Sequence, residues 1–154
     1  MTQEEKQLLL LKDLCARLPY GVKIEYLYWN EDKGCEYPVP MILDDINSDG
    51  YIRFHGDIEE GEGRGYILTY LPYLRPLSSM TIEEQKEVNN LLGYRKTING
   101  FGDIRCAGWN GDTFVNISII DKYINWLNTH HFDYRRLIEK GLALEAPEGM
   151  YKIK

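Results

Sequence analysis

The sequence lacks the features that mark membrane-spanning and secreted proteins. It contains no apolar run approaching the ~20 residues that a helix needs to cross a bilayer. Its N-terminus has no succession of basic, apolar and small residues of the kind found in secretory signals. Its 3 cysteines lie at least 20 residues apart and suggest neither a disulfide framework nor a zinc-binding pair. The sequence therefore predicts a cytoplasmic protein with free thiols.

Motifs that specify a catalytic or cofactor chemistry are also missing. The chain contains no GxxxxGKS/T, GxSxG or HExxH motif. The glycines of residues 61–65 (GEGRG) resemble a phosphate-binding loop, but a strand rather than a helix is expected after them, and the glutamate would repel phosphate. We therefore expect no cofactor, and the sequence favours a protein that is not an enzyme without excluding one.

Composition and charge are those of one ordinary globular domain. The chain has 154 residues, of which 44% are hydrophobic, and this is enough to bury a core as a single domain over residues 1–154. Its 24 acidic residues exceed its 18 basic residues, for a net charge of -6. An acidic surface makes binding to a nucleic-acid backbone unlikely on electrostatic grounds.

Helices are predicted from capping signals and from apolar residues that recur at helical spacing. Thr2 with Glu5, and Thr81 with Glu84, each have the spacing of a capping box. The predicted helices follow Thr2 as far as Leu18, follow Thr81 as far as Gly93, and run from 118 to 131, where the apolar residues share one face. A fourth, short helix is expected from Tyr134 to Lys140, with Asp133 as its N-cap.

Short runs rich in valine, isoleucine and tyrosine predict strands between the helices. They cover Val22–Trp29, Val39–Ile46, Tyr51–His55 and Tyr66–Leu71, with a fifth near 103–107 or 113–117. Short connections favour an antiparallel meander. The predicted fold class is α+β: an N-terminal helix, a curved sheet of four or five strands that could approach a barrel, and C-terminal helices packed on it.

The most reactive cluster in the sequence lies at the end of the third helix. His130, His131 and Asp133 place two imidazoles and a carboxylate within four residues, a set able to bind a metal or to transfer protons near neutral pH. Adjacent histidines on a helix point about 100° apart, however, and do not share one metal as an i, i+4 pair does. Hydrogen bonding of the imidazoles to the last helical carbonyls is the favoured interpretation.

A second candidate metal site lies between two predicted strands. Asp45, Asn47 and Asp49 precede Gly50 in the order found at the start of a calcium-binding loop. The twelfth position, which should be glutamate, is Gly56. A hairpin turn explains the same residues and is favoured.

Two tyrosine–basic pairs suggest a surface for a partner. Tyr73 with Arg75, and Tyr134 with Arg135, combine the aromatic and guanidinium groups that dominate protein interfaces. The same combination can stack on single-stranded nucleic acid, although acidic residues predominate elsewhere.

Three segments resemble a family of small uncharacterised proteins encoded in gut bacteria, often among prophage and mobile-element genes. They are LCARLPYGVKIEY (Leu14–Tyr26), PYLRPLSSMTIEE (Pro72–Glu84) and WLNTHHFDYRRLIEKGLALEAPEGMY (Trp126–Tyr151). The resemblance covers about a third of the chain. It implies a genetic setting and assigns no catalytic residue.

The leading prediction is a non-enzymatic accessory protein that binds another protein, through the pairs Tyr73 with Arg75 and Tyr134 with Arg135. The first alternative is a metal-dependent hydrolase or another enzyme that uses His130, His131 and Asp133, with His55 brought near by folding. The second is a nucleic-acid-binding protein, whose affinity would fall steeply with salt.

Overall fold

The computed structural model describes residues 1–56, 61–92, 96–98, 104–106 and 117–151. The chain divides into two compact units, each with its own apolar core. The first unit comprises Met1–Leu74 and Arg135–Pro147, and the second comprises Arg75–Tyr134 and Glu148–Lys154. Each unit is described by itself, and the single domain expected over residues 1–154 stays a prediction.

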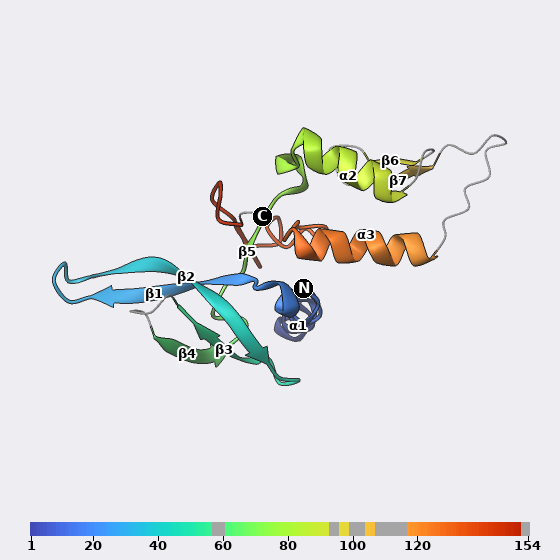
Figure 1. The fold of residues 1–154 in the computed structure, drawn as a ribbon. Helices are drawn as coiled ribbons and strands as arrows, with labels where there is room; N and C mark the ends of the chain where they lie inside the picture. The colour runs from blue at the N-terminus through green and yellow to red at the C-terminus, as the bar shows by residue number, and fades with distance from the viewer. Residues whose placement is uncertain (57–60, 93–95, 99–103, 107–116, 152–154) are drawn as a thin grey trace. The chain divides into compact units, whose positions relative to one another are not determined.

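The first unit contains one helix and a four-stranded sheet. In chain order its elements are α1 (Gln3–Arg17), the 3-10 turn η1 (Leu18–Tyr20), β1 (Lys23–Asn30), β2 (Cys35–Ile46), β3 (Tyr51–His55), β4 (Glu62–Tyr66), β5 (Tyr73–Leu74) and β8 (Leu144–Glu145). The strands β1 to β4 pair with their sequence neighbours in an antiparallel meander (Figure 1). The sheet is curled, and β5 and β8 form a separate parallel pair. The predicted α+β class and the meander are confirmed.

The last strand of this sheet differs from the one predicted. We expected a strand at Tyr66–Leu71, but β4 ends at Tyr66 and lies in the glycine-rich segment that precedes the expected strand. The reason is steric. A Cβ atom at Gly63 would collide with the ring of Phe54, and one at Gly65 would collide with the ring of Tyr70. Glycine in a strand here allows two aromatic rings to lie against the backbone.

Helix α1 supplies one wall of the core of the first unit. The Thr2–Glu5 capping box predicted from the sequence is present and begins the helix. Leu10 and Leu14 are fully buried in a cluster that includes Ile24 and the other inward-facing residues of the sheet. The burial of this apolar surface is the main driving force for this packing.

Two fully buried charges lie on the same helix. Asp13 accepts hydrogen bonds from Nε and Nη2 of Arg17 at 2.7 and 3.1 Å, and the side chains of both residues are 0% exposed. Arg135 adds a further ion pair, with its Nε 3.2 Å from Asp13 Oδ1. Removing the carboxylate would therefore leave a buried guanidinium without its counter-charge.

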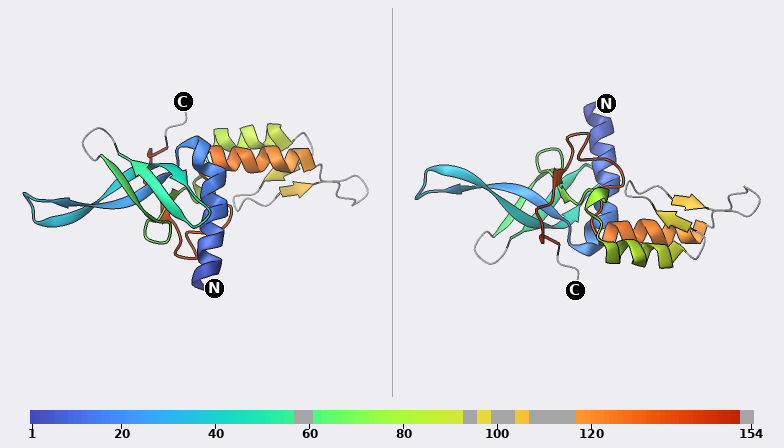
Figure 2. Two further views of the ribbon diagram at one scale, coloured as in Figure 1. Left: turned by 90° about the horizontal axis from the view of Figure 1, so that it is seen from below. Right: turned by 90° about the horizontal axis from the view of Figure 1, so that it is seen from above.

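The strands β1 and β2 are longer than the strands that follow them. Strand β3 pairs with β2 over Ile42–Ile46, so the outer part of β2 pairs with β1 alone. We call residues 27–38, the outer part of this hairpin, the arm. Figure 2 shows from two sides that the arm continues past the ends of β3 and β4 as a two-stranded ribbon.

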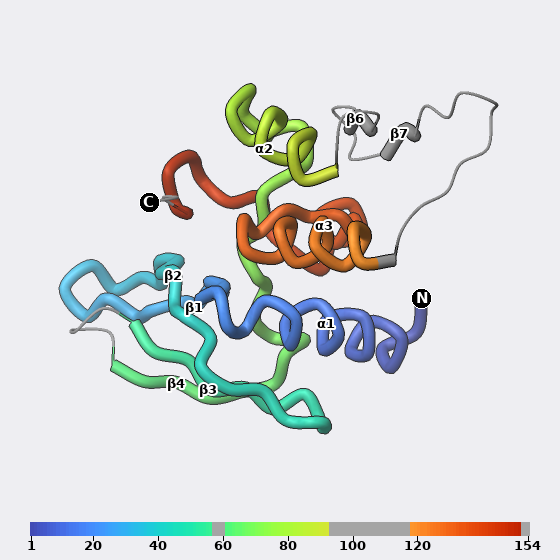
Figure 3. The backbone as a smooth tube through the Cα atoms, turned by 45° about the vertical axis from the view of Figure 1, so that its right-hand side comes forward, coloured from blue at the N-terminus to red at the C-terminus, as the bar shows by residue number. Residues whose placement is uncertain are grey.

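The second unit is built on two helices that pack on each other. Its elements are η2 (Leu77–Ser79), α2 (Ile82–Leu92), β6 (Lys96–Ile98), β7 (Ile104–Cys106) and α3 (Ile117–Thr129). Figure 3 shows α2 beside α3, and Val88, Leu92, Trp126 and Leu127 are buried in their shared cluster. The fifth predicted strand corresponds to β7, whereas residues 113–116 of its alternative position lie outside the described residues.

The short helix predicted from Tyr134 to Lys140 is absent. The described chain forms a series of turns there, and Asp133 caps no helix. Arg136 has a φ of 56°, a left-handed conformation that an α-helix does not accommodate.

Among the described residues, no helix combines the length and the apolar character that crossing a bilayer requires.

Replacing Asp13 with alanine should lower the free energy of unfolding by about 3–5 kcal/mol, because Arg17 would remain buried without its counter-charge. Urea denaturation of the two proteins measures the difference. Asp45→Ala is the matched control, since the Asp45–Arg53 pair is more than half exposed on both sides and should contribute less than about 1 kcal/mol. Equal losses in the two variants would contradict this assignment.

Candidate functional site

His130 is a buried part of the second unit. Its Nδ1 lies 2.8 Å from the carbonyl oxygen of Trp126, which accepts a hydrogen bond from it. Its ring stacks on the indole of Trp126, with 4.0 Å between the ring centroids. The favoured interpretation, an imidazole bonded to a carbonyl of the last helical turn, describes this geometry.

The backbones of His131 and Asp133 are both hydrogen-bonded to the backbone of Arg75. The carbonyl of His131 accepts the N–H of Arg75 at 2.8 Å, and the N–H of Asp133 donates to the carbonyl of Arg75 at 2.7 Å. The ring of His131 stacks on Tyr151. Within the described parts of the chain, no three histidine, cysteine or acidic side chains gather as metal ligands would. His55, the fourth residue of the hydrolase alternative, belongs to the first unit, where its Nδ1 lies 2.6 Å from Asp44.

The calcium-like segment forms the turn between β2 and β3. The side-chain oxygen of Asn47 accepts hydrogen bonds from the N–H groups of Asp49 and Tyr51, at 3.0 and 2.9 Å. Gly50 takes a φ of 78°, as this turn requires. Asp45 points to Arg53, 3.2 Å away, so its carboxylate serves a cross-strand ion pair. The geometry is that of the favoured hairpin turn.

Two of the four predicted interaction residues are not exposed, contrary to our expectation. Tyr73 is buried, and its hydroxyl donates to Glu25 across 3.3 Å. Burial, with the charge and hydrogen bond of Glu25, raises the pKa of this tyrosine. The side chain of Arg75 is only 15% exposed, because it is folded against an acidic partner and an aromatic ring. The assignment of these residues as partner contacts stays a prediction.

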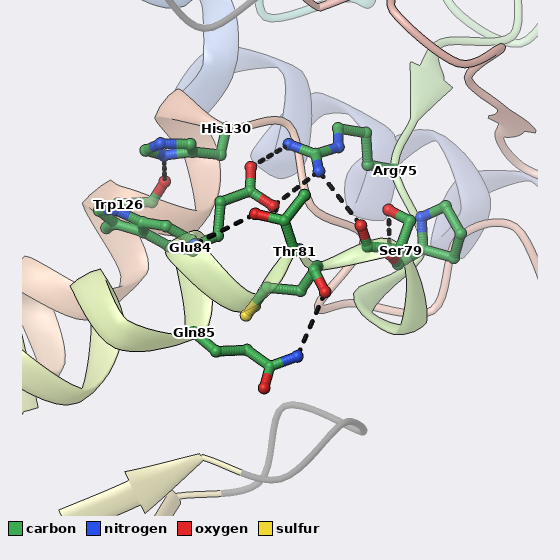
Figure 4. A network of polar contacts seen from close by, with 9 residues as sticks. Arg75, Ser79, Thr81, Glu84, Gln85, Trp126 and His130 are labelled. Atoms are coloured by element: carbon green, nitrogen blue, oxygen red, sulfur yellow. Dashed lines mark hydrogen bonds and ion pairs between the residues drawn. The ribbon is translucent and has the colours of Figure 1, made fainter.

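Arg75 contacts three segments of the second unit, and Figure 4 shows its guanidinium against the carboxylate of Glu84. Its two terminal nitrogens donate to the two carboxylate oxygens of Glu84 at 2.7 and 2.9 Å. The guanidinium lies over the ring of Phe132, 4.3 Å from its centroid. Glu84 is in turn the capping-box partner of Thr81 at the start of α2. The bidentate pair with Glu84 therefore links the chain after β5 to α2. The contact with Phe132 links it to the segment that follows α3.

The electrostatics of this pair favour the ionised carboxylate. Burial of the Glu84 carboxyl acts to raise its pKa, but hydrogen bonds from the Arg75 side chain and the Thr81 backbone outweigh it. The positive charge of Arg75 adds to the effect, and the net pKa of Glu84 is lowered. The arrangement stabilises the fold, and it engages both terminal nitrogens of Arg75.

The other predicted pair is half-buried. Tyr134 packs against the apolar cluster of the second unit. Arg135 is 31% exposed and pairs with Asp13 in the first unit. The basic partner in each tyrosine–basic pair is thus bound to a buried acidic residue.

The arm carries the exposed apolar groups that sequence reasoning missed. Leu27 is 51% exposed and Trp29 is 53% exposed. They point to one face of β1, because residues two apart in a strand share a face. Pro38 and Pro40, also exposed, lie opposite Leu27 and Glu25 on β2 and so face the same way. We call the three of these residues that lie on the arm, Leu27, Trp29 and Pro38, the outer stripe.

The opposite face and the tip of the arm are organised by local contacts. The rings of Tyr28 and Tyr37, directly opposed in the register, lie 5.7 Å apart. At the tip, the side chain of Asn30 accepts the N–H of Lys33 at 2.8 Å, and Gly34 takes a φ of 62°. These contacts stabilise the ribbon, which has no third strand beside it in the described part of this unit.

A sequence signal for the arm was present. Two prolines within a run of β-branched and aromatic residues mark an edge strand or an isolated ribbon. The predicted strand began at Val39, after Pro38, and therefore omitted the outer half of β2, which begins at Cys35. Without that half, no strand was expected opposite Leu27 and Trp29.

Comparison with known proteins does not add a family to these observations. No protein-family model, no curated protein and no solved structure matches the chain. The functional argument therefore rests on the geometry of the described residues.

Replacing Glu84 with glutamine should lower the free energy of unfolding by about 2 kcal/mol near neutral pH, through loss of the charge-assisted pair with Arg75. Because the folded-state pKa of Glu84 is depressed, this stability is present above its unfolded-state pKa. It is lost as the pH falls through the folded-state pKa. Urea denaturation at a series of pH values should show the two proteins converging in acid.

Glu83→Gln is the matched control, since Glu83 is an exposed carboxyl in the same helical turn. It should follow the wild-type protein at every pH. A Glu84→Gln difference that persists unchanged in acid would show that the carboxylate charge is not its source.

Proposed function

We propose that the chain is a cytoplasmic, non-enzymatic accessory protein that binds another protein through the outer stripe of the arm. One observation supports this most directly: Leu27 and Trp29 are about half exposed, side by side, on a ribbon that projects beyond its sheet. Contiguous exposed apolar groups of this kind are characteristic of interaction sites. We propose in addition that the protein is encoded among prophage or mobile-element genes, as the sequence resemblance implies.

The cost of keeping these side chains in water supports a binding role. Fully burying a leucine side chain stabilises by roughly 1.5–3 kcal/mol, and tryptophan buries a larger area. Tryptophan is also enriched among the residues that dominate binding energy at interfaces. A partner that covers Leu27 and Trp29 would recover this free energy without a large change in the arm, because the hairpin is already closed at Asn30 and Gly34.

The charges around the outer stripe favour a protein over a nucleic acid. Glu31, Asp32 and Glu36 are exposed near the tip, with Lys33 as the one basic residue among residues 30–37. Phosphate groups would be repelled by this surface. A protein with lysine or arginine beside an apolar patch would complement it.

The hydrolase alternative receives less support from the geometry. His130 is bonded to a backbone carbonyl and stacked on an indole. His131 is stacked on Tyr151, and both imidazoles are buried. These contacts are those of side chains that hold a fold together.

Affinity co-purification of the tagged full chain from nuclease-treated lysate of its host tests the proposal. We expect one protein to be recovered near stoichiometrically with the wild-type chain and to fall at least about tenfold with Trp29→Ala, because the indole contributes a central contact. Quantitative mass spectrometry of the eluates measures the ratio.

Tyr66→Ala is the matched control, because Tyr66 is 62% exposed on β4, outside the arm. Its eluate should equal that of the wild-type chain. Recovery that is the same for Trp29→Ala and wild type would remove the outer stripe from the function. Loss on nuclease treatment would instead favour nucleic-acid binding.

A further inference from the structure

The two long edges of the arm differ in their capacity to form hydrogen bonds. The N–H of Leu43 donates to the carbonyl of Val22 at 3.0 Å, so these residues form a hydrogen-bonded pair. Such pairs alternate with non-hydrogen-bonded pairs along an antiparallel ladder. In the observed register, Leu27 opposite Pro38 is therefore a non-hydrogen-bonded pair, and so is Trp29 opposite Glu36. The backbone groups of these residues point away from the partner strand, towards the edges.

Proline residues prevent strand pairing along one of these edges. Pro38 and Pro40 both lie at positions where the backbone nitrogen faces the outer edge of β2. Proline has no N–H, so this edge lacks two of the donors that a further strand would need. Natural sheets use proline at edges in this way to prevent unwanted strand pairing.

The edge of β1 has no such protection. The N–H and C=O groups of Leu27 and Trp29 face it, and no described residue of this unit pairs with them. Closer to the sheet the same edge is already occupied. The N–H of Glu25 donates to the carbonyl of Leu71 at 2.8 Å, and Ile24 forms an antiparallel bridge with Pro72. The chain thus adds an extended segment of its own to this edge and leaves the outer half of it open.

We infer that the open edge of β1 at Leu27 and Trp29 receives an extended segment of the partner protein as an additional β-strand. This inference rests on the proposed function and specifies how the partner binds. Backbone hydrogen bonds to Leu27 and Trp29 supply part of the affinity, as in other cases of strand addition. The proline-containing edge of β2 restricts the addition to one side of the arm.

The side chains beside the open edge define the chemistry of the added segment. Leu27 and Trp29 lie on one face of β1, and Tyr28 lies on the other. Both faces of an added strand would therefore meet apolar or aromatic neighbours, which favours a continuous run of valine, isoleucine and aromatic residues. Glu31 and Asp32 at the tip favour lysine or arginine at the end of that run.

Selection from a random-peptide phage library with the full chain as bait provides a probe that does not require the natural partner. We expect enriched peptides to contain a β-branched and aromatic run next to a basic residue. Hydrogen exchange of the wild-type chain with and without a selected synthetic peptide then reports the mode of binding. The amides of Leu27 and Trp29 should exchange at least about tenfold more slowly when the peptide is bound.

A pair of variants separates the contribution of the Leu27 backbone to peptide affinity from that of its side chain. Leu27→Ala and Leu27→Pro both remove the leucine side chain, but only proline removes the N–H that faces the open edge. Peptide affinity should be about fivefold to tenfold weaker for Leu27→Pro than for Leu27→Ala, the effect of one lost hydrogen bond. Circular dichroism of both variants checks that they fold, and the exchange measurement on the wild-type chain requires neither of them.

Three outcomes would overturn the inference. Equal affinities for the two variants with unprotected amides would show binding to the face of the arm, and the proposed function would stand. Protection that grows with protein concentration in the absence of peptide would identify a second copy of this chain as the occupant. No enriched peptide would contradict the addition of such a strand, whereas a co-purified partner lost with Trp29→Ala would still uphold the proposed function.

Discussion

The register between β1 and β2 is the constraint on which the surface of the arm depends. One hydrogen bond, from the N–H of Leu43 to the carbonyl of Val22, identifies which residue pairs exchange backbone bonds. Pro38 and Pro40 therefore lie at non-hydrogen-bonded positions, where the missing N–H of proline costs no hydrogen bond between β1 and β2. A shift by one residue would require one of the two strands to turn over, which would either place both prolines inside the ladder or turn Leu27 and Trp29 towards the other face. The same pairing therefore determines the exposed side chains and the open backbone edge.

Elsewhere in the chain, the charged side chains that could have bound a ligand instead form ion pairs that hold segments of the fold together. Arg75 is bonded to Glu84 through both terminal nitrogens, and Asp13 accepts hydrogen bonds from Arg17 and forms an ion pair with Arg135. Charges buried in this way are costly to separate, because each partner would remain desolvated without compensation. These buried ion pairs contain the same residue types as a binding site. Only the burial of their side chains distinguishes them from one. Tyrosine–arginine pairs in a sequence are consequently weak evidence for an interface.

The arm differs from these clusters because two of its apolar residues, Leu27 and Trp29, belong to neither buried apolar cluster. Tyr28 and Tyr37 stabilise the ribbon through their own contact. Leu27 and Trp29 lie on the other face, and about half of each remains exposed. A two-stranded ribbon has little stability by itself, and exposed tryptophan adds nothing to it. Their exposure is the observation on which the proposed partner site rests.

Local rules were enough to predict the helices and most of the sheet. The capping boxes at Thr2 and Thr81 depend on residues three positions apart, so both could be recognised in the sequence and both are present. The meander followed from short connections. The prediction failed for β4, where Gly63 and Gly65 leave room for the rings of Phe54 and Tyr70, contacts that strand propensity does not indicate. It also failed for residues 134–140, where Arg136 takes a left-handed conformation that its sequence neighbours do not signal.

The sequence by itself determined the α+β class, the order of the antiparallel strands and the capping of α1 and α2, because these depend on the periodicity and spacing of neighbouring residues. Tertiary structure decided which polar groups are buried and which apolar groups are exposed. Arg75 is covered because Glu84 and Phe132 are brought to it from α2 and from the segment after α3. Trp29 is exposed because β3 pairs with only the inner part of β2. Burial depends on contacts between distant segments, and such contacts have no local signature in the sequence.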